Sequence, residues 1–421
     1  MNSIRLFLLD FLRNTTQRNL YNQFIFNYKH YSTEDILKYS EKESRRLVEF
    51  HIANNPCYKN WIISQGINIS DWQFNQLPII TKKDMTPDMA VKSEIFKWSH
   101  SGGTTGMPFS YPLSEKAVSA LWPNLWRAFS SCDIHPCEKI LMIAGPSLFN
   151  NRNFKRKIFD AINRFIVVSA FDLNDQVLND AVKKIKQAQI KAIYGYTSSV
   201  LVFLEFLQKN NIHITLKGIF TTSETFIPKV RLLAKEFCSC DVIDIYGAND
   251  GGICAFECKA HSGYHISFER TYLEIIDHKI IITDLYNTAY PFIRYQVGDM
   301  TSSEIVDISL CKCGSHLFRI NNISGRINSY ITDLDGTKIH TEFFSHVFHK
   351  DLRIEQYQIT EYPQKIEINI ISSLLNLETI GYVYNGIIQK RFLKQVEFVI
   401  NRPLVRLLNQ KTPILVKKYS D

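Results

Sequence analysis

Residues 191–221 read K-A-I-Y-G-Y-T-S-S-V-L-V-F-L-E-F-L-Q-K-N-N-I-H-I-T-L-K-G-I-F-T and decide the class of fold. The runs Lys191–Tyr194 and Lys217–Thr221 are typical of strands, and Ser198–Asn210 between them has the i, i+3, i+4 apolar spacing of a helix. Further strands and one further helix are predicted around this unit: the strands Lys139–Ala144, Arg164–Ser169 and Val242–Tyr246, and the helix Val177–Gln189. Alternating strands and helices indicate an α/β fold with a largely parallel sheet covered on both faces.

The pattern changes from Gly263 onward, where short strands follow one another at hairpin spacing. They are predicted at His265–Phe268, Leu273–Ile276 and Lys279–Thr283. After Gly325 the chain is typical of a compact α+β unit, with strands near Tyr357–Thr360 and Lys365–Ile371 and a helix near Ile388–Ile400. We therefore expect two domains, residues 1–325 and residues 326–421, with the boundary at Gly325–Arg326.

Composition excludes several classes of protein. The 421 residues are 45% apolar and 21% charged, which is enough to bury a core. No run of 18 uncharged apolar residues occurs, which argues against a transmembrane segment. The formal charge of +8 is spread along the chain, without the basic stripe interleaved with aromatic residues that is typical of nucleic-acid binders. Nine cysteines, an odd number with no secretory signal, favour a reducing cytoplasm over a disulfide framework.

The segment Met1–Asn14 is apolar but is interrupted by Asp10 and Arg13, unlike an export signal. Ile4, Leu8, Phe11 and Leu12 fall on one side of a helix, so we expect this helix to pack on its own domain. A weak contact of this helix with a membrane surface is the alternative.

The glycine-rich segment Ser99–Gly106, S-H-S-G-G-T-T-G, is the strongest local signal in the chain. Its glycines permit unusual backbone angles, and its backbone N–H groups and hydroxyls can surround phosphate oxygens. The segment is not a P-loop, because no Gly-Lys-Ser/Thr follows, and its spacing differs from that of a dinucleotide fingerprint. An ordinary flexible loop is the alternative to a phosphate-binding loop.

Two predicted strands end in polar residues, at I-F-T-T-S-E (219–224) and V-I-D-I-Y-G (242–247). Ligands of open parallel sheets bind beyond the carboxyl ends of the strands, so both ends can reach the glycine-rich segment. The motifs T-D-L (283–285), P-F-I-R-Y-Q-V-G-D (291–299) and S-G-R (324–326) follow in order.

This ordered set resembles the adenylate-forming (AMP-binding) superfamily, which comprises the acyl- and aryl-CoA ligases and their relatives. It is most similar to the branch of phenylacetate–CoA ligase, coenzyme F390 synthetase and the CapK-like proteins, from L-P-I-I-T-K-K-D (77–84) to the C-terminus. The resemblance implies a large N-terminal domain with mostly parallel sheets and a small, mobile α+β C-terminal lid domain. It also implies a ligase that uses ATP to convert a carboxylic acid into an acyl-adenylate, with release of pyrophosphate.

Carried over residue by residue, the resemblance implies a site for ATP and Mg²⁺. The phosphates would meet the loop residues Ser101, Gly102, Gly103, Thr104, Thr105 and Gly106. Ser223 and Glu224 would lie at the adenine pocket, and Tyr246, followed by Gly247, would stack on the base. Asp250 would be a catalytic residue near Mg²⁺, where the family usually has glutamate. Asp299 would accept hydrogen bonds from the ribose hydroxyls, and Arg326 would contact ribose or phosphate.

The family's C-terminal domain carries a catalytic lysine, commonly after Ser-Gly, that meets the substrate carboxylate and the α-phosphate. Here N-Q-K-T-P (409–413) occupies that place without the glycine, and Lys411 is the predicted catalytic lysine. Lys417 and Lys418 are its competitors. Asn328 stands where the family often has an acidic hinge residue.

Cys311-Lys312-Cys313-Gly314 has the paired sulfurs and the tight turn of a metal knuckle, and tetrahedral Zn²⁺ needs two further ligands. The resemblance to the F390-synthetase-like branch, at E-C…G-x-H…C-x-C-G, implies that these are Cys258 and His265. Four protein ligands would make the site closed and structural.

Other cysteines and histidines offer different interpretations. Cys254 and His261 are local alternatives as zinc ligands. Cys238 and Cys240 form a second C-x-C, which is interpreted as a pair of buried thiols.

The chemistry of acid activation requires alignment and charge stabilisation, without a protein nucleophile. The acyl acceptor is left open between CoA and an amine or carrier, the latter suited to capsule or other polysaccharide assembly. The expected cofactors are ATP, Mg²⁺, structural Zn²⁺ and, for a CoA ligase, CoA. The alternative from another class is a catalytically degraded adenylation fold that acts as a scaffold in polysaccharide assembly, suggested by Asp250 and Gln410.

Overall fold

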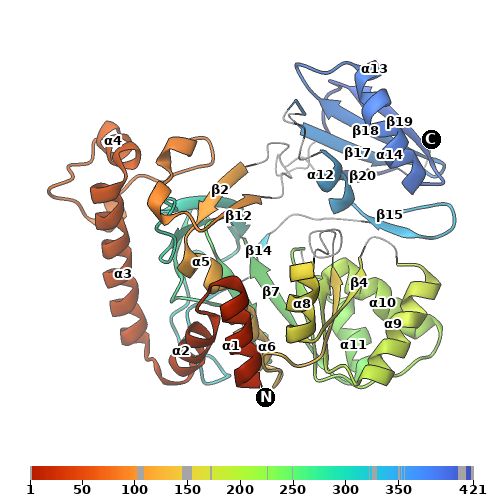
Figure 1. The fold of residues 1–421 in the computed structure, drawn as a ribbon, viewed down its shortest axis with the longest axis horizontal. Helices are drawn as coiled ribbons and strands as arrows, with labels where there is room; N and C mark the ends of the chain where they lie inside the picture. The colour runs from red at the N-terminus through yellow and green to blue at the C-terminus, as the bar shows by residue number, and fades with distance from the viewer. Residues whose placement is uncertain are drawn as a thin grey trace.

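Figure 1 shows the fold in a computed structural model of the chain. It describes residues 2–101, 109–144, 154–170, 173–224, 226–248, 250–321, 323–324, 330–348, 351, 353–354, 356–405 and 414–418. Within these ranges, no helix combines the length and the apolar character that a membrane crossing requires.

The largest element is an eight-stranded sheet of order β13-β9-β8-β7-β6-β5-β3-β4. Its strands are β3 (Ile140–Ala144), β4 (Phe165–Ser169), β5 (Ala192–Tyr196), β6 (Gly218–Thr222), β7 (Asp241–Gly247), β8 (Cys254–Glu257), β9 (Tyr264–Ile266) and β13 (Arg319–Ile320). The run β4-β3-β5-β6-β7 is parallel, and β8, β9 and β13 extend it in antiparallel pairing. The five strands predicted between residues 139 and 246 are therefore confirmed, and so is the α/β class of fold.

Alternation along the strands divides the core between the two faces of this sheet. In β3, Leu141 and Ile143 pack into one apolar core with helices α9 (Asp175–Ala188), α10 (Thr197–Lys209) and α11 (Lys229–Cys238). Ile140 and Met142 pack into the other with α6 (Leu121–Ser130), α8 (Phe154–Asn163) and the N-terminal helix. Both faces are covered, as expected for a mainly parallel sheet.

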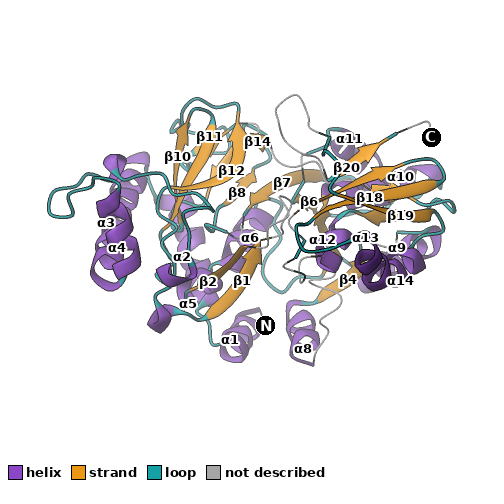
Figure 2. Ribbon diagram, turned by 90° about the horizontal axis from the view of Figure 1, so that it is seen from above, coloured by secondary structure: helices purple, strands orange, loops and turns teal. Residues whose placement is uncertain are grey.

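A four-stranded antiparallel sheet, order β10-β11-β12-β14, lies beside the large one (Figure 2). Its strands are β10 (Thr271–Ile276), β11 (Lys279–Asp284), β12 (Tyr295–Thr301) and β14 (Ile323–Ser324). Asp277 and His278, both at positive φ, form the tight turn between β10 and β11, as a two-residue hairpin requires. The predicted strand at His265–Phe268 is shorter and is not part of this hairpin series, because β9 pairs with β8 and β13 in the large sheet.

The N-terminal quarter is helical and borders both sheets. It contains α1 (Asn2–Arg13), α2 (Gln17–His30), α3 (Thr33–Asn54) and α4 (Pro56–Ser64), followed by the short 3-10 helices η1 (Phe74–Gln76), η2 (Pro87–Met89) and η3 (Lys92–Glu94). The strand pair β1 (Lys97–Ser101) and β2 (Phe109–Leu113) and the helix α5 (Glu115–Ser119) lead from there into α6. Ser32 and Asp35 start α3 with a reciprocal capping box.

The packing face predicted for the first helix is wrong. Leu6 and Leu9 are the side chains of α1 that are buried against the domain. Ile4, Leu8, Phe11 and Leu12, which were expected to pack inward, are exposed. The helix is apolar over a wide arc, so periodicity alone cannot tell which side of it meets the domain.

Residues beyond 330 form a separate apolar core around a second four-stranded sheet, order β19-β18-β17-β20. The elements are β15 (Tyr330–Thr332), β16 (Lys338–His340), α12 (Glu342–Phe348), β17 (Gln356–Glu361), β18 (Lys365–Ile371), α13 (Leu377–Ile380), the π-helical turn η4 (Gly381–Asn385), α14 (Gly386–Ile388), the 3-10 helix η5 (Gln389–Arg391), β19 (Gln395–Ile400) and β20 (Leu415–Lys417). Phe343 of α12 also packs against the core beneath α9–α11. The expected domain boundary, Gly325–Arg326, lies outside the described residues.

The helix predicted near Ile388–Ile400 is wrong. Helical structure ends at Arg391, and Gln395–Ile400 forms β19, which pairs in parallel with β18 along its whole length. Val396 alternates with Glu397 and is buried in the core of this part of the chain. A β-branched segment can satisfy either period, and here pairing with a neighbouring strand decides in favour of the sheet.

Candidate active site

The carboxyl ends of β6 and β7 lie side by side, as the sequence predicts. Thr222 and Ile245 are register partners in this parallel pair, so Ser223 and Tyr246, the next residues of each strand, leave the same edge of the sheet. Ser223 has φ +70, a left-handed backbone conformation that is uncommon for a residue with a side chain. It is exposed there, and Tyr246 is half-buried.

Tyr246 and Asp299 are brought together from different sheets. The Tyr246 hydroxyl donates to Asp299 Oδ2 at 2.8 Å. Asp299 lies in β12, directly after Gly298, which has φ +96. The two residues expected to hold the base and the ribose of ATP thus meet at one edge, 53 positions apart in the chain.

Glu224 is directed toward the first turn of α10. Its Oε2 accepts from the backbone N of Ser198 at 2.7 Å and from Ser198 Oγ at 2.5 Å. A carboxylate at a helix N-terminus satisfies free backbone donors and meets the positive end of the helix dipole. The structure therefore shows Glu224 joining the end of β6 to α10, and its expected place beside adenine stays a prediction.

Asp250 is buried three residues beyond the end of β7. Its Oδ2 lies 2.9 Å from Lys82 Nζ and accepts from the Tyr295 hydroxyl at 3.2 Å. The chain then turns through Gly251 and Gly252, both at positive φ. A Cβ at Gly252 would collide with the buried ion pair that Arg270 forms with Asp284 of the T-D-L motif.

This ion pair explains a motif that the sequence left without a stated role. Arg270 Nε and Asp284 Oδ1 are 3.0 Å apart, and both side chains are almost fully buried. Packed against Gly252, the pair fixes the turn that carries Asp250. Asp284 therefore acts indirectly, because its ion pair with Arg270 holds the turn that carries Asp250. Position 252 requires glycine, since a side chain there would collide with this ion pair.

Lys82 is a functional candidate that the sequence reasoning did not single out. It stands in T-K-K-D, inside the L-P-I-I-T-K-K-D motif, so the signal was present without an assigned role. Besides its contact with Asp250, its ammonium lies 5.9 Å from the centroid of the Phe109 ring. Phe109 begins β2 and pairs with Ser101, so the two flanks of the glycine-rich loop lie beside Lys82 and Asp250.

Several predicted residues lie outside the described part of the chain: Gly102, Gly103, Thr104, Thr105, Gly106, Asn328, Arg326, Gln410 and Lys411. Ser101 is the one residue of the predicted phosphate loop within the described ranges, and it is the last residue of β1. Gly247, predicted to lie beside the nucleotide, is the last residue of β7. The competitors of Lys411 have local contacts. Lys417 Nζ is 3.1 Å from Glu361 Oε2, and Lys418 Nζ is 3.4 Å from the Tyr362 hydroxyl.

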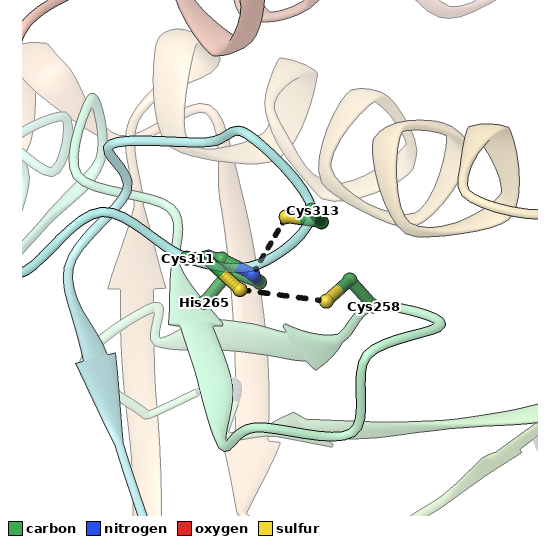
Figure 3. Close-up of side chains that lie close together, drawn as sticks. All are labelled: Cys258, His265, Cys311 and Cys313. Atoms are coloured by element: carbon green, nitrogen blue, oxygen red, sulfur yellow. Dashed lines mark hydrogen bonds between the residues drawn. The ribbon is translucent and has the colours of Figure 1, made fainter.

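The four predicted zinc ligands converge on one point (Figure 3). The sulfurs of Cys258, Cys311 and Cys313 and one ring nitrogen of His265 all lie within 4.8 Å of one another. The Cys258 and Cys311 sulfurs are 3.8 Å apart, and the Cys313 sulfur is 3.5 Å from His265 Nε2. Cys258 follows β8, His265 lies in β9, and the other two come from a loop 46 residues further on.

These distances fit the edges of a zinc tetrahedron. Zn–S bonds of about 2.3 Å and Zn–N bonds of about 2.0–2.1 Å give edges of about 3.8 Å between sulfurs and about 3.5 Å between sulfur and nitrogen. The Cys258 thiol and the His265 ring hold the pKa of the Cys313 thiol far below its usual range, which favours the thiolate that a metal binds. The donor set therefore suits Zn²⁺ and leaves no position for a substrate.

The other cysteine interpretations are also resolved. Cys254 and His261 do not belong to the group of four; His261 Nδ1 instead lies 3.5 Å from Glu257 Oε2. Cys238 and Cys240 are buried, as expected, and burial raises the pKa of the Cys238 thiol to about 12. These two thiols are therefore poor nucleophiles and belong to the core.

A buried polar network connects the carboxyl ends of β6 and β7 with the cysteine–histidine group. Asp244 of β7 accepts from Thr221 Oγ1 at 2.5 Å and from the Tyr264 hydroxyl at 2.8 Å. Burial raises the pKa of Asp244 to about 7 despite these two hydrogen bonds. Glu257, beside Cys258, accepts from the backbone N of Asp244 at 3.1 Å and pairs with Arg231.

Two proteins of known name are similar in sequence to this chain. Protein CapK of Staphylococcus aureus is 24% identical over 311 residues, which cover 69% of this chain and 68% of CapK. Indoleacetate–lysine synthetase of Pseudomonas savastanoi is 27% identical over 164 residues, 35% of this chain and 40% of that protein. No protein-family model matches the chain.

Solved structures with the same fold extend the likeness to nearly the whole chain. A crystal structure of 2-hydroxyisobutyryl-CoA ligase with 2-HIB-AMP and CoA, in the thioesterification state, superposes with a TM-score of 0.60 at 16% identity and covers 93% of this chain and 92% of that one. An open conformation of that ligase gives a TM-score of 0.55 at 16% identity and covers 91% of both chains. The recognition made from the motifs is thus confirmed: the chain has the fold of the adenylate-forming ligases, and the relatives whose names state a reaction are ligases.

Proposed function

We propose that this protein activates a carboxylic acid with ATP, forming an acyl-adenylate and releasing pyrophosphate. The observation that carries the proposal is that two pairs, Tyr246–Asp299 and Lys82–Asp250, form at the carboxyl end of β7 and in the turn that follows it. One pair offers a carboxylate acceptor and an aromatic ring, which suits a nucleoside. The other offers a cation and a metal-binding carboxylate, which suits phosphates.

The residues of this edge act by alignment and charge. In the reaction, an oxygen of the substrate carboxylate bonds to the α-phosphorus and the bond to the pyrophosphate oxygen breaks. No covalent protein intermediate is needed, so the catalytic effect comes from holding the reactants in line and from stabilising charge on the phosphate oxygens. Asp250 would hold Mg²⁺, which supplies positive charge at the phosphates.

Further residues, most of them outside the described ranges, complete the proposal. We assign the loop Ser101–Gly106 to the ATP phosphates, with Ser223 at the adenine. From residues 326–421, proposed to be a lid domain, Arg326 would contact ribose or phosphate and Lys411 would contact the reacting oxygens. These assignments are supported by the order of the motifs and by Phe109, which pairs with Ser101 across the two ends of the loop and lies beside Lys82.

The acyl acceptor is proposed from the relatives. One similar structure holds an acyl-AMP and CoA, and one relative is named for joining indoleacetate to lysine. CoA and an amine are therefore both candidate acceptors. A cytoplasmic role in polysaccharide assembly stays a proposal that the motif resemblance to CapK-like proteins implies. The scaffold alternative rests on the departures at Asp250 and Gln410, although Asp250 keeps its negative charge and its place.

We also propose that Cys258, His265, Cys311 and Cys313 hold a structural Zn²⁺. The tetrahedral edges described above support this assignment. Binding of Zn²⁺ would fix the loop that carries Cys311 and Cys313 against the β8–β9 hairpin, away from Tyr246 and Asp299.

The deciding experiment is an ATP-dependent hydroxamate assay with a panel of aryl, fatty and amino acids. We expect hydroxamate and pyrophosphate to appear together for one class of acid and to require Mg²⁺. Adding CoA or lysine in place of hydroxylamine would then identify the acceptor. A protein that binds an ATP analogue but releases no pyrophosphate with any acid in the panel would support the scaffold alternative instead.

A further inference from the structure

Helix α1 presents an apolar face to solvent. Ile4, Phe7, Leu8, Phe11 and Leu12 are all exposed, with Phe11 at 77% and Ile4 at 66%. Their spacing of i, i+3, i+4, i+7 and i+8 places them along one side of the helix. Five large apolar side chains on one short helix form a contiguous patch, of the kind that marks an interaction site.

The opposite side of α1 is fixed to the domain, so this exposure is not a matter of a loose terminus. Leu6 and Leu9 are buried. Arg5 Nη1 donates to the carbonyl oxygen of Ile162 at 3.0 Å, and the Arg13 guanidinium lies 5.1 Å from the centroid of the Phe159 ring. Both contacts bind α1 to α8.

The negative charge of α1 is committed to the neighbouring helix. Asp10 Oδ1 accepts from the backbone N of Gln17 at 2.7 Å, and its Oδ2 accepts from the backbone N of Arg18 at 3.0 Å. The carboxylate thereby satisfies the first turn of α2. It does not lie among the apolar side chains that face solvent.

The two chain segments that contain α1 and α8 also carry an excess of positive charge. Residues 2–18 contain three arginines and one aspartate, and residues 154–164 contain four basic residues and one acidic residue, a net charge of +5. The rest of the first 325 residues is balanced, since residues 326–421 carry the other +3 of the total of +8. Figure 2 shows α1 and α8 side by side at one edge of the molecule.

We propose that α1 docks on a membrane surface that contains anionic lipids. An apolar helical face combined with neighbouring basic residues supplies the two contributions that peripheral membrane binding needs, burial of side chains and attraction to acidic headgroups. A second copy of the chain fits less well, because joining two of these faces would bring +5 against +5. The patch is also a single convex helix rather than a groove, which suits insertion between headgroups.

The test is co-sedimentation of the purified protein with vesicles. We expect it to pellet with equimolar phosphatidylcholine and phosphatidylglycerol, much less with phosphatidylcholine alone, and less again as NaCl rises to about 0.5 M. Phe7→Ser combined with Phe11→Ser removes the most apolar area without touching the core and should weaken binding at least about tenfold. The matched control, Leu232→Ser combined with Leu374→Ser, removes two exposed leucines elsewhere (71% and 75%) and should bind like wild type.

The charge contribution is tested separately. Lys157→Glu on α8 should weaken binding to the anionic vesicles by about fivefold or more. Lys184→Glu, on α9 across the sheet, is its control and should have little effect. Unchanged thermal midpoints would confirm that all four variants are folded.

Three results would overturn the proposal. The first is wild-type protein that does not pellet with the anionic vesicles. The second is a Phe7→Ser/Phe11→Ser variant that pellets as well as the wild type. The third is a wild-type dimer in sedimentation velocity that becomes a monomer in this variant, which would assign the face to a second copy.

Discussion

Lys82 and Asp250 form an ion pair, 2.9 Å from Nζ to Oδ2, across 168 positions of sequence. The lysine is partly exposed and the carboxylate is buried, so the ammonium balances a charge that would otherwise be costly in the interior. A polyphosphate with its metal ion would bring a competing cation to Asp250 and competing anions to Lys82. We infer that the pair holds the site ready before nucleotide binds and that Lys82 turns to phosphate when it does.

Removing the Lys82 charge should therefore slow acid activation. We expect Lys82→Gln to stay folded and to lose about 10²–10³ in the rate of pyrophosphate release, the loss typical of one charge-stabilising donor. Lys83→Gln, a neighbouring exposed lysine, is the control and should behave like wild type. Equal rates for the Lys82→Gln and Lys83→Gln variants would show that Lys82 serves only to neutralise Asp250.

Asp299 should determine the affinity for the nucleotide. Asp299→Ala removes the acceptor of the Tyr246 hydroxyl and, in our proposal, of the ribose. A lost hydrogen bond to a charged group costs about 1.5–3 kcal/mol, which corresponds to a rise of about tenfold or more in KM for ATP. Binding of a non-hydrolysable ATP analogue measures this directly, with the exposed Glu304→Ala as a control that should leave affinity unchanged.

Lys411 should act in the adenylation step. Lys411→Ala is expected to fold normally and to lose acyl-adenylate formation, because the positive charge near the α-phosphate is gone. Lys418→Ala tests one of the two competing lysines and should retain activity. Pyrophosphate release that is unchanged in the Lys411→Ala variant would rule the assignment out.

The cysteine–histidine group should bind one Zn²⁺ per chain. Since structural zinc can contribute on the order of 10 kcal/mol, we expect Cys311→Ser to lose the metal and to unfold at a clearly lower temperature. Cys57→Ser lies outside the group and should keep both metal and stability. Metal analysis of the purified wild-type protein that finds no zinc would end this proposal.

Asp244 should make stability depend on pH. Its pKa of about 7 in the folded chain exceeds the value of about 3.9 expected when unfolded, so the folded state holds an extra proton between these values. The contribution of Asp244 to the free energy of unfolding is therefore most favourable below about pH 4, and it decreases as the pH rises to about 7. We expect a loss on the order of 2–3 kcal/mol between pH 5 and pH 8.

Urea unfolding at each pH, followed by tryptophan fluorescence, measures this change. All five tryptophans lie between residues 61 and 126, and Trp126 is buried in the core, so its emission should change when the large domain unfolds. Asp244→Asn should flatten the dependence, and Asp71→Asn, at an exposed position, should not. The same slope in the wild type and in the Asp244→Asn variant would assign the pH dependence to other groups.

Sequence by itself determined the alternating strands and helices between residues 139 and 247, the edge at which Ser223 and Tyr246 emerge, and the four residues that meet in the cysteine–histidine group. These succeeded for a physical reason. Strand and helix periods are local properties of the chain, and the polar ends of parallel strands must share one edge. In the cysteine–histidine group, Cys311 and Cys313 were named from their C-x-C-G spacing, and Cys258 and His265 from a resemblance between motifs.

Only the tertiary structure decided the features that depend on a partner distant in sequence. Gln395–Ile400 became a strand because β18 offered it a ladder of backbone hydrogen bonds. The inward face of α1 was chosen by its contacts with α8. The same packing brings residues 2–18 close to residues 154–164, so that their net charge of +5 comes from segments far apart in the sequence. Lys82 meets Asp250 for the same reason: pairing across 168 residues is set by packing, and no local period records it.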